Sequence, residues 1–308
     1  MIKERGFRVL SALDTPKGRQ ELADELNYRE DTVSDALNDL AQRDLIDKER
    51  AGNRIIAKPG DARCVEVFQS LTKSNPHIDF PDLFTPSLLN ILYYLSSDEG
   101  WTATELAEQT GHARATIYRG LRTLTNRAMA VKQHSRYRLT ESFNELHVFA
   151  CELQHHSHRV RIKQDIGSGT IVWKSHEEFL VRTETEVEQS DYHRTGLDAF
   201  TEYGLQFFTT SEQYYFYSAE QESLRPEDLF CHLLLIENDS RHRKYALLLA
   251  AKTDLSPERL KTAVDEYGIT EIVDPLVEFL QTDGGKSSEA TPRWEEFETL
   301  ADEYGVEL

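Results

Sequence analysis

The sequence predicts an α+β fold: two tandem copies of a small helical unit, each ending in a β-ribbon, followed by a mixed α/β domain. Three observations support this prediction. Residues 1–60 repeat the pattern of a later stretch without gaps, the apolar positions in both stretches follow helical spacing, and residues 166–218 contain short aromatic runs typical of strands. A chain of 308 residues is long enough for two or three domains.

The second copy begins with a short helix and a turn. Thr102 and Glu105 have the spacing of a capping box, which predicts that a helix starts there. Gly111 can adopt the positive φ that a sharp turn after this helix requires. A second helix is expected from about Arg114 to Arg127, because apolar residues recur at i, i+4 and i+7, namely Ile117, Leu121 and Leu124.

The order of elements after this turn resembles a winged helix-turn-helix domain. The second helix is followed by two short extended runs around His134 and Ser135, which predict a β-ribbon, or wing. Ala107, Gly111 and Ile117 match the small, turn and apolar positions of that family. The resemblance implies that the second helix enters the major groove of DNA.

Charge favours the same function. Between His112 and Arg138 there are seven Lys and Arg residues and no Asp or Glu, although the whole chain has a net charge of −19. Such a local reversal fits contacts with phosphates and base edges. The alternative is a solvated amphipathic helix in a protein-interaction module.

The residues expected to contact double-stranded DNA lie on the second helix and the wing. They are Arg114, Thr116, Tyr118, Arg119, Arg122, Arg127, Lys132, Arg136 and Arg138. Tyr118, Arg119 and Arg122 are expected to contact bases or anchor the helix, and Arg114 and Arg127 to neutralise phosphates. Arg136 or Arg138 is expected to contact the backbone or an adjacent minor groove.

The first copy aligns with the second at an offset of 84 residues. Glu21-Leu22-Ala23 meets Glu105-Leu106-Ala107, and Asn27, which tolerates a left-handed backbone, stands in place of Gly111. Its outward helix face carries Asp31 and Asp35, and 10 acidic residues oppose 8 basic ones from Lys17 to Lys58. We therefore expect an accessory DNA contact, or a packing and dimer module.

The pattern of motifs and linkers predicts five segments. They are a first winged helix at 1–72, a second winged helix at 84–141, a connecting or dimerisation helix at 142–160, a C-terminal α/β module at 166–282, and a linker with a last helix at 283–308. In the C-terminal module, Leu205–Thr209 and Gln213–Tyr217 are expected to form a hairpin.

The segment 142–160 has two faces of interest. One is an apolar seam that could pair two chains into a homodimer, formed by Leu146, Phe149, Leu153, His156 and Val160. The other carries His147, Cys151, His155 and His158, which could ligate a zinc-type ion. Imidazoles on a surface helix explain this second face better, so we predict no metal and no cofactor.

Two short runs in the C-terminal module resemble AbiEi-type antitoxins. In TGLDAFTEYGL the match is Gly204-Leu205, and in SLRPEDLFCHLLL it is Pro226-Glu227. That family joins an N-terminal winged helix to an α/β domain and represses the operon of a nucleotidyltransferase-like toxin. The resemblance implies a repressor with such a toxin as partner. This chain departs from the family in having two winged helices.

Enzyme chemistry is the alternative for this module. A nucleotidyltransferase-like effector fused to a DNA-targeting arm would need a Gly-Ser turn and metal-holding carboxylates, and Gly167-Ser168 precedes Glu184 and Glu186. The third carboxylate is missing, and a solvated acidic loop explains the pair better. Walker A, GxGxxG and nucleophile-elbow patterns are also absent, so we predict no catalytic residues.

Composition bounds the environment. The 54 Asp and Glu against 35 Lys and Arg resemble the surfaces of haloarchaeal proteins, where molar salt screens the repulsion between an acidic protein and DNA. The three cysteines are far apart and predict neither a disulfide framework nor a zinc pair. With no apolar run of membrane-spanning length and no secretory signal, we expect a cytoplasmic protein.

Overall fold

The computed structural model describes residues 2–51, 54–208 and 211–308. The chain divides into two compact units, residues 1–161 (unit 1) and 162–308 (unit 2). Three of the predicted segments, 1–72, 84–141 and 142–160, therefore fall within one compact unit. Within the described part of the chain, no helix is both long and apolar enough to cross a membrane.

Unit 1 contains the same order of elements twice: a helix, a short strand, two helices and two longer strands. The first repeat comprises α1 (Glu4–Ala12), β1 (Lys17–Gly18), α2 (Arg19–Leu26), α3 (Glu30–Gln42), β2 (Ile46–Ala51) and β3 (Arg54–Pro59). The second repeat comprises α6 (Pro86–Tyr94), β4 (Trp101–Thr102), α7 (Ala103–Thr110), α8 (Arg114–Asn126), β5 (Ala130–Gln133) and β6 (Arg136–Leu139).

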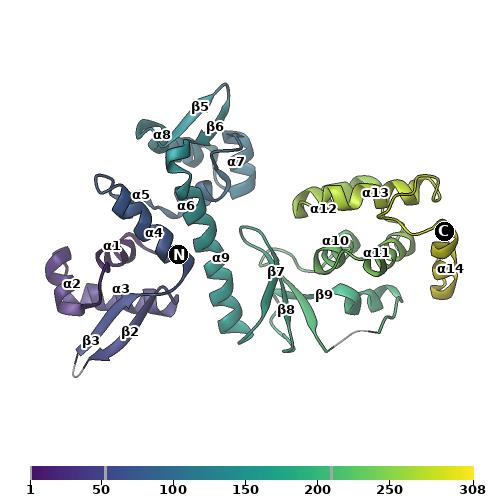
Figure 1. Cartoon of the computed structure of the whole chain (residues 1–308), viewed down its shortest axis with the longest axis horizontal. Coiled ribbons are helices and arrows are strands. Elements are labelled where there is room, and N and C mark those ends of the chain that lie inside the picture. Colours follow the sequence, from purple (N-terminus) through teal and green to yellow (C-terminus); the bar gives the residue numbers. More distant parts are fainter. Residues whose placement is uncertain (1, 52–53, 209–210) are drawn as a thin grey trace. The chain divides into compact units, whose positions relative to one another are not determined.

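Each repeat closes with a three-stranded antiparallel sheet. The strand orders are β1-β3-β2 and β4-β6-β5, so the short first strand joins the outer edge of the later ribbon in both cases. Figure 1 shows the two ribbons, β2–β3 and β5–β6, at the ends of their repeats. The gapless offset in the sequence thus corresponds to a repeated topology.

Both repeats turn between their second and third helices at a left-handed residue. The residues are Asn27, with φ of 52°, and Gly111, with φ of 64°. The predicted capping box is confirmed: Thr102 Oγ1 accepts from Glu105 N at 3.2 Å, and Glu105 Oε2 accepts from Thr102 N at 2.7 Å. The capping box and the left-handed turn thus set the start of α7 and the turn before α8 where the sequence predicts them.

A cluster of four phenylalanines joins the first repeat, the connecting segment and α9. Phe7 belongs to α1, Phe68 to α4 (Arg63–Ser74), Phe84 follows α5 (Phe80–Leu83), and Phe149 belongs to α9 (Glu145–Asp165), which is preceded by the short helix η1 (Glu141–Phe143). Phe149 lies 4.9 Å from Phe84, 5.5 Å from Phe68 and 6.2 Å from Phe7 between ring centroids. All four rings are almost fully buried.

The apolar seam of α9 is occupied within unit 1. Leu146 and Phe149 belong to its hydrophobic core, and Leu153 packs against that core. His156 Nε2 lies 2.7 Å from the carbonyl oxygen of Arg43 at the end of α3. The seam that predicted a dimerisation helix therefore packs on the first repeat, and dimerisation itself stays a prediction.

Unit 2 is built on a four-stranded antiparallel sheet of order β7-β8-β10-β9. Its strands are β7 (Thr170–Lys174), β8 (Phe179–Thr183), β9 (Tyr192–Thr195) and β10 (Gln213–Tyr217), and the 3-10 helix η2 (Gly196–Tyr203) follows β9. The predicted hairpin between 205–209 and 213–217 is wrong for the described residues: 205–208 form no strand, and β10 pairs with β8 and β9. Residue 209 lies outside the described residues.

Among its described residues, unit 2 also contains five α-helices after the sheet. They are α10 (Pro226–Ile236), α11 (Ser240–Lys252), α12 (Pro257–Tyr267), α13 (Thr270–Gln281) and α14 (Trp294–Tyr304). In Figure 1, α10 and α11 lie between the β9–η2 side of the unit and the pair α12–α13. Phe297 and Ala301 of α14 are buried in the same core as α10, so the segment predicted as a linker and last helix contributes to this domain.

The aromatic cluster generates a prediction for stability. Replacing Phe149 with alanine leaves a cavity beside Phe7 of the first repeat and Phe84 of the connecting segment, and such a truncation costs about 3 to 5 kcal/mol. Chemical denaturation in high KCl should show this loss in unit 1. Ser157→Ala, an exposed position on the same helix, is the control and should stay within about 0.5 kcal/mol of wild type. An unchanged midpoint for Phe149→Ala would contradict the packing described.

Candidate nucleic-acid interface

The inner face of α8 fixes how this helix is held. Ile117, Leu121 and Leu124 are buried at the spacing that the sequence predicted. Gly120 lies where α8 crosses α6, and a Cβ there would meet Ile91 Cδ1 at 2.6 Å and Leu88 Cδ1 at 3.2 Å. Glycine therefore lets α8 lie close to α6 without displacing these two side-chain ends.

The outer face of α8 carries the predicted DNA-contacting side chains. Arg114, Tyr118, Arg119, Arg122 and Arg127 are exposed, and Thr116 is half-buried. Tyr118 is 53% exposed, which is unusual for a large aromatic side chain. In the part of the chain that the structure describes, none of these four arginines forms an ion pair within unit 1 or unit 2. Their charges therefore remain available to a partner.

The wing carries two exposed cations without an acidic partner among the described residues and one cation that forms an ion pair. Lys132 and Arg138 are exposed on β5 and β6, and Lys132 Nζ lies 5.1 Å from the centroid of the Tyr137 ring. Arg136 instead donates to Glu105 Oε1 at 2.9 Å and to the carbonyl oxygen of Gly100. Hydrogen bonds from Thr102, joined by the attraction of Arg136, lower the pKa of Glu105.

Arg136 thus has a second task that the sequence pattern did not reveal. Glu105 caps α7 and pairs with Arg136 of β6, so one carboxylate links the start of the helix-turn-helix to the wing. The two residues are 31 positions apart, and only the pairing of β4 with β6 brings them together. The sequence pointed to Glu105 as a capping residue but not to its pairing with Arg136, and it gave no signal for the role of Gly120.

The corresponding surface of the first repeat has few available cations. Arg19 pairs with Glu30 at 2.7 Å, Arg29 lies 3.8 Å from Asp31, and Arg43 pairs with Asp39 at 3.0 Å. Lys48 Nζ donates to Asn38 Oδ1 at 2.6 Å. Arg50 and Arg54 remain exposed on the strands of its ribbon. The acidic residues of α3 thus neutralise arginines that occupy this side of the repeat.

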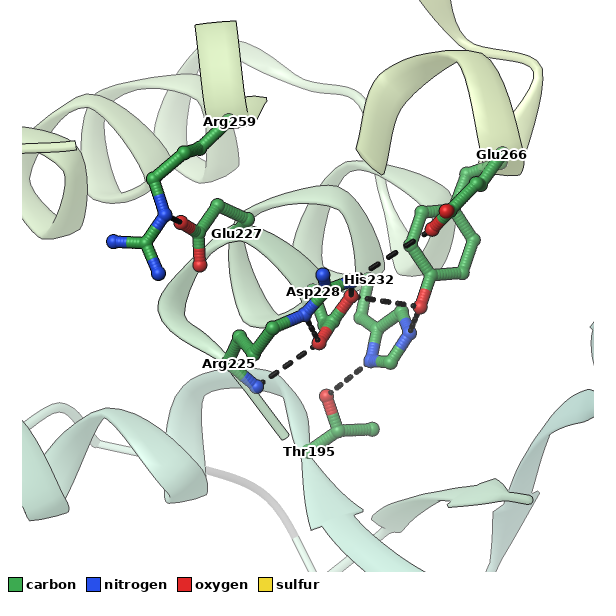
Figure 2. Close-up of polar contacts among 8 residues, drawn as sticks. Thr195, Arg225, Glu227, Asp228, His232, Arg259 and Glu266 are labelled. Atoms are coloured by element: carbon green, nitrogen blue, oxygen red, sulfur yellow. Dashed lines mark hydrogen bonds and ion pairs between the residues drawn. The ribbon is translucent and has the colours of Figure 1, made fainter. Parts of the chain in front are cut away.

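Unit 2 contains a different cluster, a buried polar network between the sheet and two helices (Figure 2). Thr195 Oγ1 lies 2.9 Å from His232 Nδ1, and His232 Nε2 lies 2.9 Å from Tyr267 Oη. Tyr267 Oη donates to Asp228 Oδ1 at 3.3 Å. Since the tyrosine proton goes to the carboxylate, His232 must donate from Nε2, and Thr195 must donate to Nδ1.

Arg225 terminates this network at its acidic end. Its Nε donates to Asp228 Oδ2 at 2.9 Å and its Nη2 to Oδ1 at 2.8 Å, while Glu266 lies 3.6 Å away. Burial raises the pKa of Asp228, but the hydrogen bonds of Arg225 outweigh burial and lower it overall. Complete burial lowers the pKa of His232 to about 3, so this histidine is neutral at ordinary pH.

The carboxylate of Glu227, next to Asp228, has fewer polar contacts than that of Asp228. The side chain of Glu227 is 2% exposed, and its Oε1 lies 3.1 Å from Arg259 Nε. Neither carboxylate oxygen has a hydrogen-bond partner within the described part of the chain, so Arg259 contributes an ion pair alone. Together with the Arg225–Glu266 contact, this pair tethers α12 to the start of α10 (Figure 2). We assign these groups a structural role.

Three groups of residues bear on metal and nucleotidyltransferase chemistry. Within the described residues, the group with three ligand atoms close enough for a metal is Glu237, Asp239 and His242. Asp239 there caps α11, accepting from His242 N at 2.7 Å. His147, Cys151 and His155 pack against the end of α6 through Leu92 and Tyr93. Glu184 and Glu186 are exposed beyond the end of β8.

Comparison with protein families supports the region identified by geometry. Residues 88–134 match the IclR helix-turn-helix domain, a span that includes α7, α8 and β5. Residues 189–306 match the HVO_2833_C family model, a C-terminal domain. A search of curated proteins finds no match. An IclR-type helix-turn-helix domain supports a DNA-binding transcriptional regulator, and a regulator rather than an enzyme.

The buried network predicts how stability depends on pH. The folded-state pKa of His232 lies below its unfolded value of about 6.5, so below that pH the unfolded chain binds a proton that the folded chain rejects. The contribution of neutral His232 to the free energy of unfolding is therefore complete above about pH 6.5. It is lost as the pH falls toward about 3. At pH 5 the loss from His232 is about 2 kcal/mol.

The measurement is denaturant unfolding of unit 2 between neutral pH and about pH 4.5, with His232→Gln beside wild type. The glutamine variant should lose this part of the acid slope. Thr195→Val is the control, because it removes a hydrogen bond of the same network but keeps the imidazole. Parallel slopes for wild type and His232→Gln would refute the neutral, buried state of His232.

Proposed function

We propose that the chain is a sequence-specific repressor that binds double-stranded DNA through two tandem winged helix-turn-helix domains. The second repeat supplies the main contact. The observation that carries this proposal is the coincidence of the IclR-type match, residues 88–134, with an α8 face whose four arginines are exposed and unpaired in the described structure. Although the chain is rich in acidic residues, none of them pairs with these four arginines in the described structure, so the arginines do not serve to balance charge within the fold.

The geometry of the second repeat supports a division of contacts. Tyr118, Arg119 and Arg122 project from the middle of α8, where a helix in the major groove meets base edges. Arg114 and Arg127 flank them at the helix ends and suit phosphates. On the wing, Lys132 and Arg138 suit the DNA backbone. Arg136 is better assigned to holding the wing on Glu105 than to a direct contact.

The first repeat is proposed as an accessory winged helix. Its topology matches that of the second repeat, but the arginines near α3 are neutralised by Glu30, Asp31 and Asp39. Arg50 and Arg54 on its ribbon could still contact the backbone of a long operator. Homodimerisation, which would present two copies to a palindromic operator, is tested by sedimentation of the full chain in high KCl.

An antitoxin role is the second candidate. The two motifs that resemble AbiEi-type antitoxins have the expected local forms: Gly204 ends η2 with φ of 78°, and Pro226 opens the buried helix α10. Both lie within the 189–306 family match. Co-purification with a separate nucleotidyltransferase-like protein would support this role, and repression without such a partner would leave only the regulator.

The ranking of the two repeats gives the main prediction. Arg119→Ala or Arg122→Ala removes an exposed, unpaired guanidinium from α8 and should cost about 1 to 3 kcal/mol of specific binding. Arg29→Ala should cost less, because Asp31 lies 3.8 Å from this arginine. Gel-shift titration and footprinting on the protein's own promoter at one fixed salt concentration measure the difference.

The matched control is non-specific DNA of the same length. Loss of a base contact should reduce the preference for the promoter, whereas loss of a phosphate contact should weaken binding to both DNAs alike. If Arg29→Ala impairs promoter binding more than Arg119→Ala and Arg122→Ala do, the first repeat is the main reader and the proposed ranking is wrong.

A further inference from the structure

Unit 2 contains a pocket that none of the functions above uses. It has a volume of about 280 Å³ and lies where the ends of α11 and α13 meet the start of α14. Its wall combines aliphatic side chains with one indole, formed by Leu255, Leu260, Val277, Leu280 and Trp294. Such a volume suits a small organic molecule rather than a single ion.

The position of Trp294 in this wall is fixed by its surroundings. Its ring lies 5.4 Å from Phe279 and 5.8 Å from Phe297 between centroids. Gly284 has φ of 74°, and a Cβ at this position would lie 2.5 Å from Trp294 Cβ. Only glycine allows the turn after α13 to pass this close to the indole, so the aromatic wall is preformed.

The rim of the pocket is acidic and lacks compensating cations. Asp254, Asp283 and Glu307 line it, and its described lining includes no Lys or Arg. Asp254 and Asp283 follow the last residues of α11 and α13, at the negative ends of both helix dipoles. Both have left-handed backbones, with φ of 47° and 45°.

Aspartate is an unfavourable choice at these two positions. A left-handed residue after a helix is usually glycine or asparagine, and a carboxylate there is repelled by the helix carbonyls. Acidic residues are abundant in this chain, so the rim alone would carry little weight. Here three carboxylates line the same pocket as aliphatic side chains and the indole of Trp294, a combination that attracts a cation with an apolar body.

We propose that this pocket binds a small organic ammonium ion bearing an apolar group. The ammonium would lie at the rim between Asp254 and Asp283, with its apolar part against Trp294, Val277 and Leu280. An anionic ligand is disfavoured by the three carboxylates. This inference concerns unit 2 alone and is independent of the DNA-binding proposal.

The test is isothermal titration of the full chain with benzyltrimethylammonium in about 1 M KCl, where the Debye length is about 3 Å and only contact-range attraction survives. Saturable binding with one ligand per chain is expected. Benzyl alcohol, which has the ring without the charge, should bind about tenfold more weakly, and benzoate should not bind. Equal binding of benzyl alcohol, or no saturable binding of the cation, would overturn the proposal.

Two double variants assign the binding to this pocket. Asp254→Asn with Asp283→Asn removes the rim charges with a residue that tolerates left-handed backbone, and should weaken binding of the cation about tenfold. Glu271→Gln with Asp274→Asn removes the same number of charges from exposed positions of α13 outside the pocket, and should leave affinity within about twofold. Equal losses in both would show diffuse attraction to an acidic protein and refute the site.

Discussion

The packing of Phe149 against Phe84, Phe68 and Phe7 is the contact on which the arrangement of unit 1 depends. Each repeat is small, and its own helices bury only a modest apolar surface. The phenylalanine cluster draws residues from the first repeat, the connecting segment and α9 into one core. Because α9 follows the second repeat directly, this core makes the two repeats a single structural body rather than two separate domains.

Short-range interactions that do not involve the α8 arginines hold the elements of the second repeat together. Gly120 lets α8 rest on α6, Gly111 turns the chain, and Glu105 fixes both the start of α7 and the wing through Arg136. None of these interactions consumes the charge of the α8 arginines. The fold of the second repeat therefore does not depend on ion pairs of these arginines, and their charges remain available to a binding partner.

Local signals were predictable from the sequence, and contacts between distant segments were not. The capping box, the left-handed turn and the buried face of α8 follow from spacing and residue type, and the structure confirms them. The hairpin before β10 was wrong, because aromatic content indicates a strand but not its partner, and β10 pairs with β8 and β9. The seam of α9 was correctly seen as apolar, but only the fold shows that unit 1 covers it. The Glu105–Arg136 pair and the Asp228 network needed tertiary structure for the same reason.

The contrast between the two repeats shows what separates an available cation from an occupied one. Arg19, Arg29 and Arg43 surround α3, and each lies within ion-pair distance of an acidic residue on that helix. On α8 the equivalent region has no acidic residue, so the arginines extend into solvent. The backbone topology is the same in both repeats. At the offset of 84 residues, Arg114, Arg119 and Arg122 of α8 stand where α3 has Glu30, Asp35 and Asn38. The second repeat therefore owes its positive face both to the absence of acids and to the presence of arginines, within a chain of net charge −19.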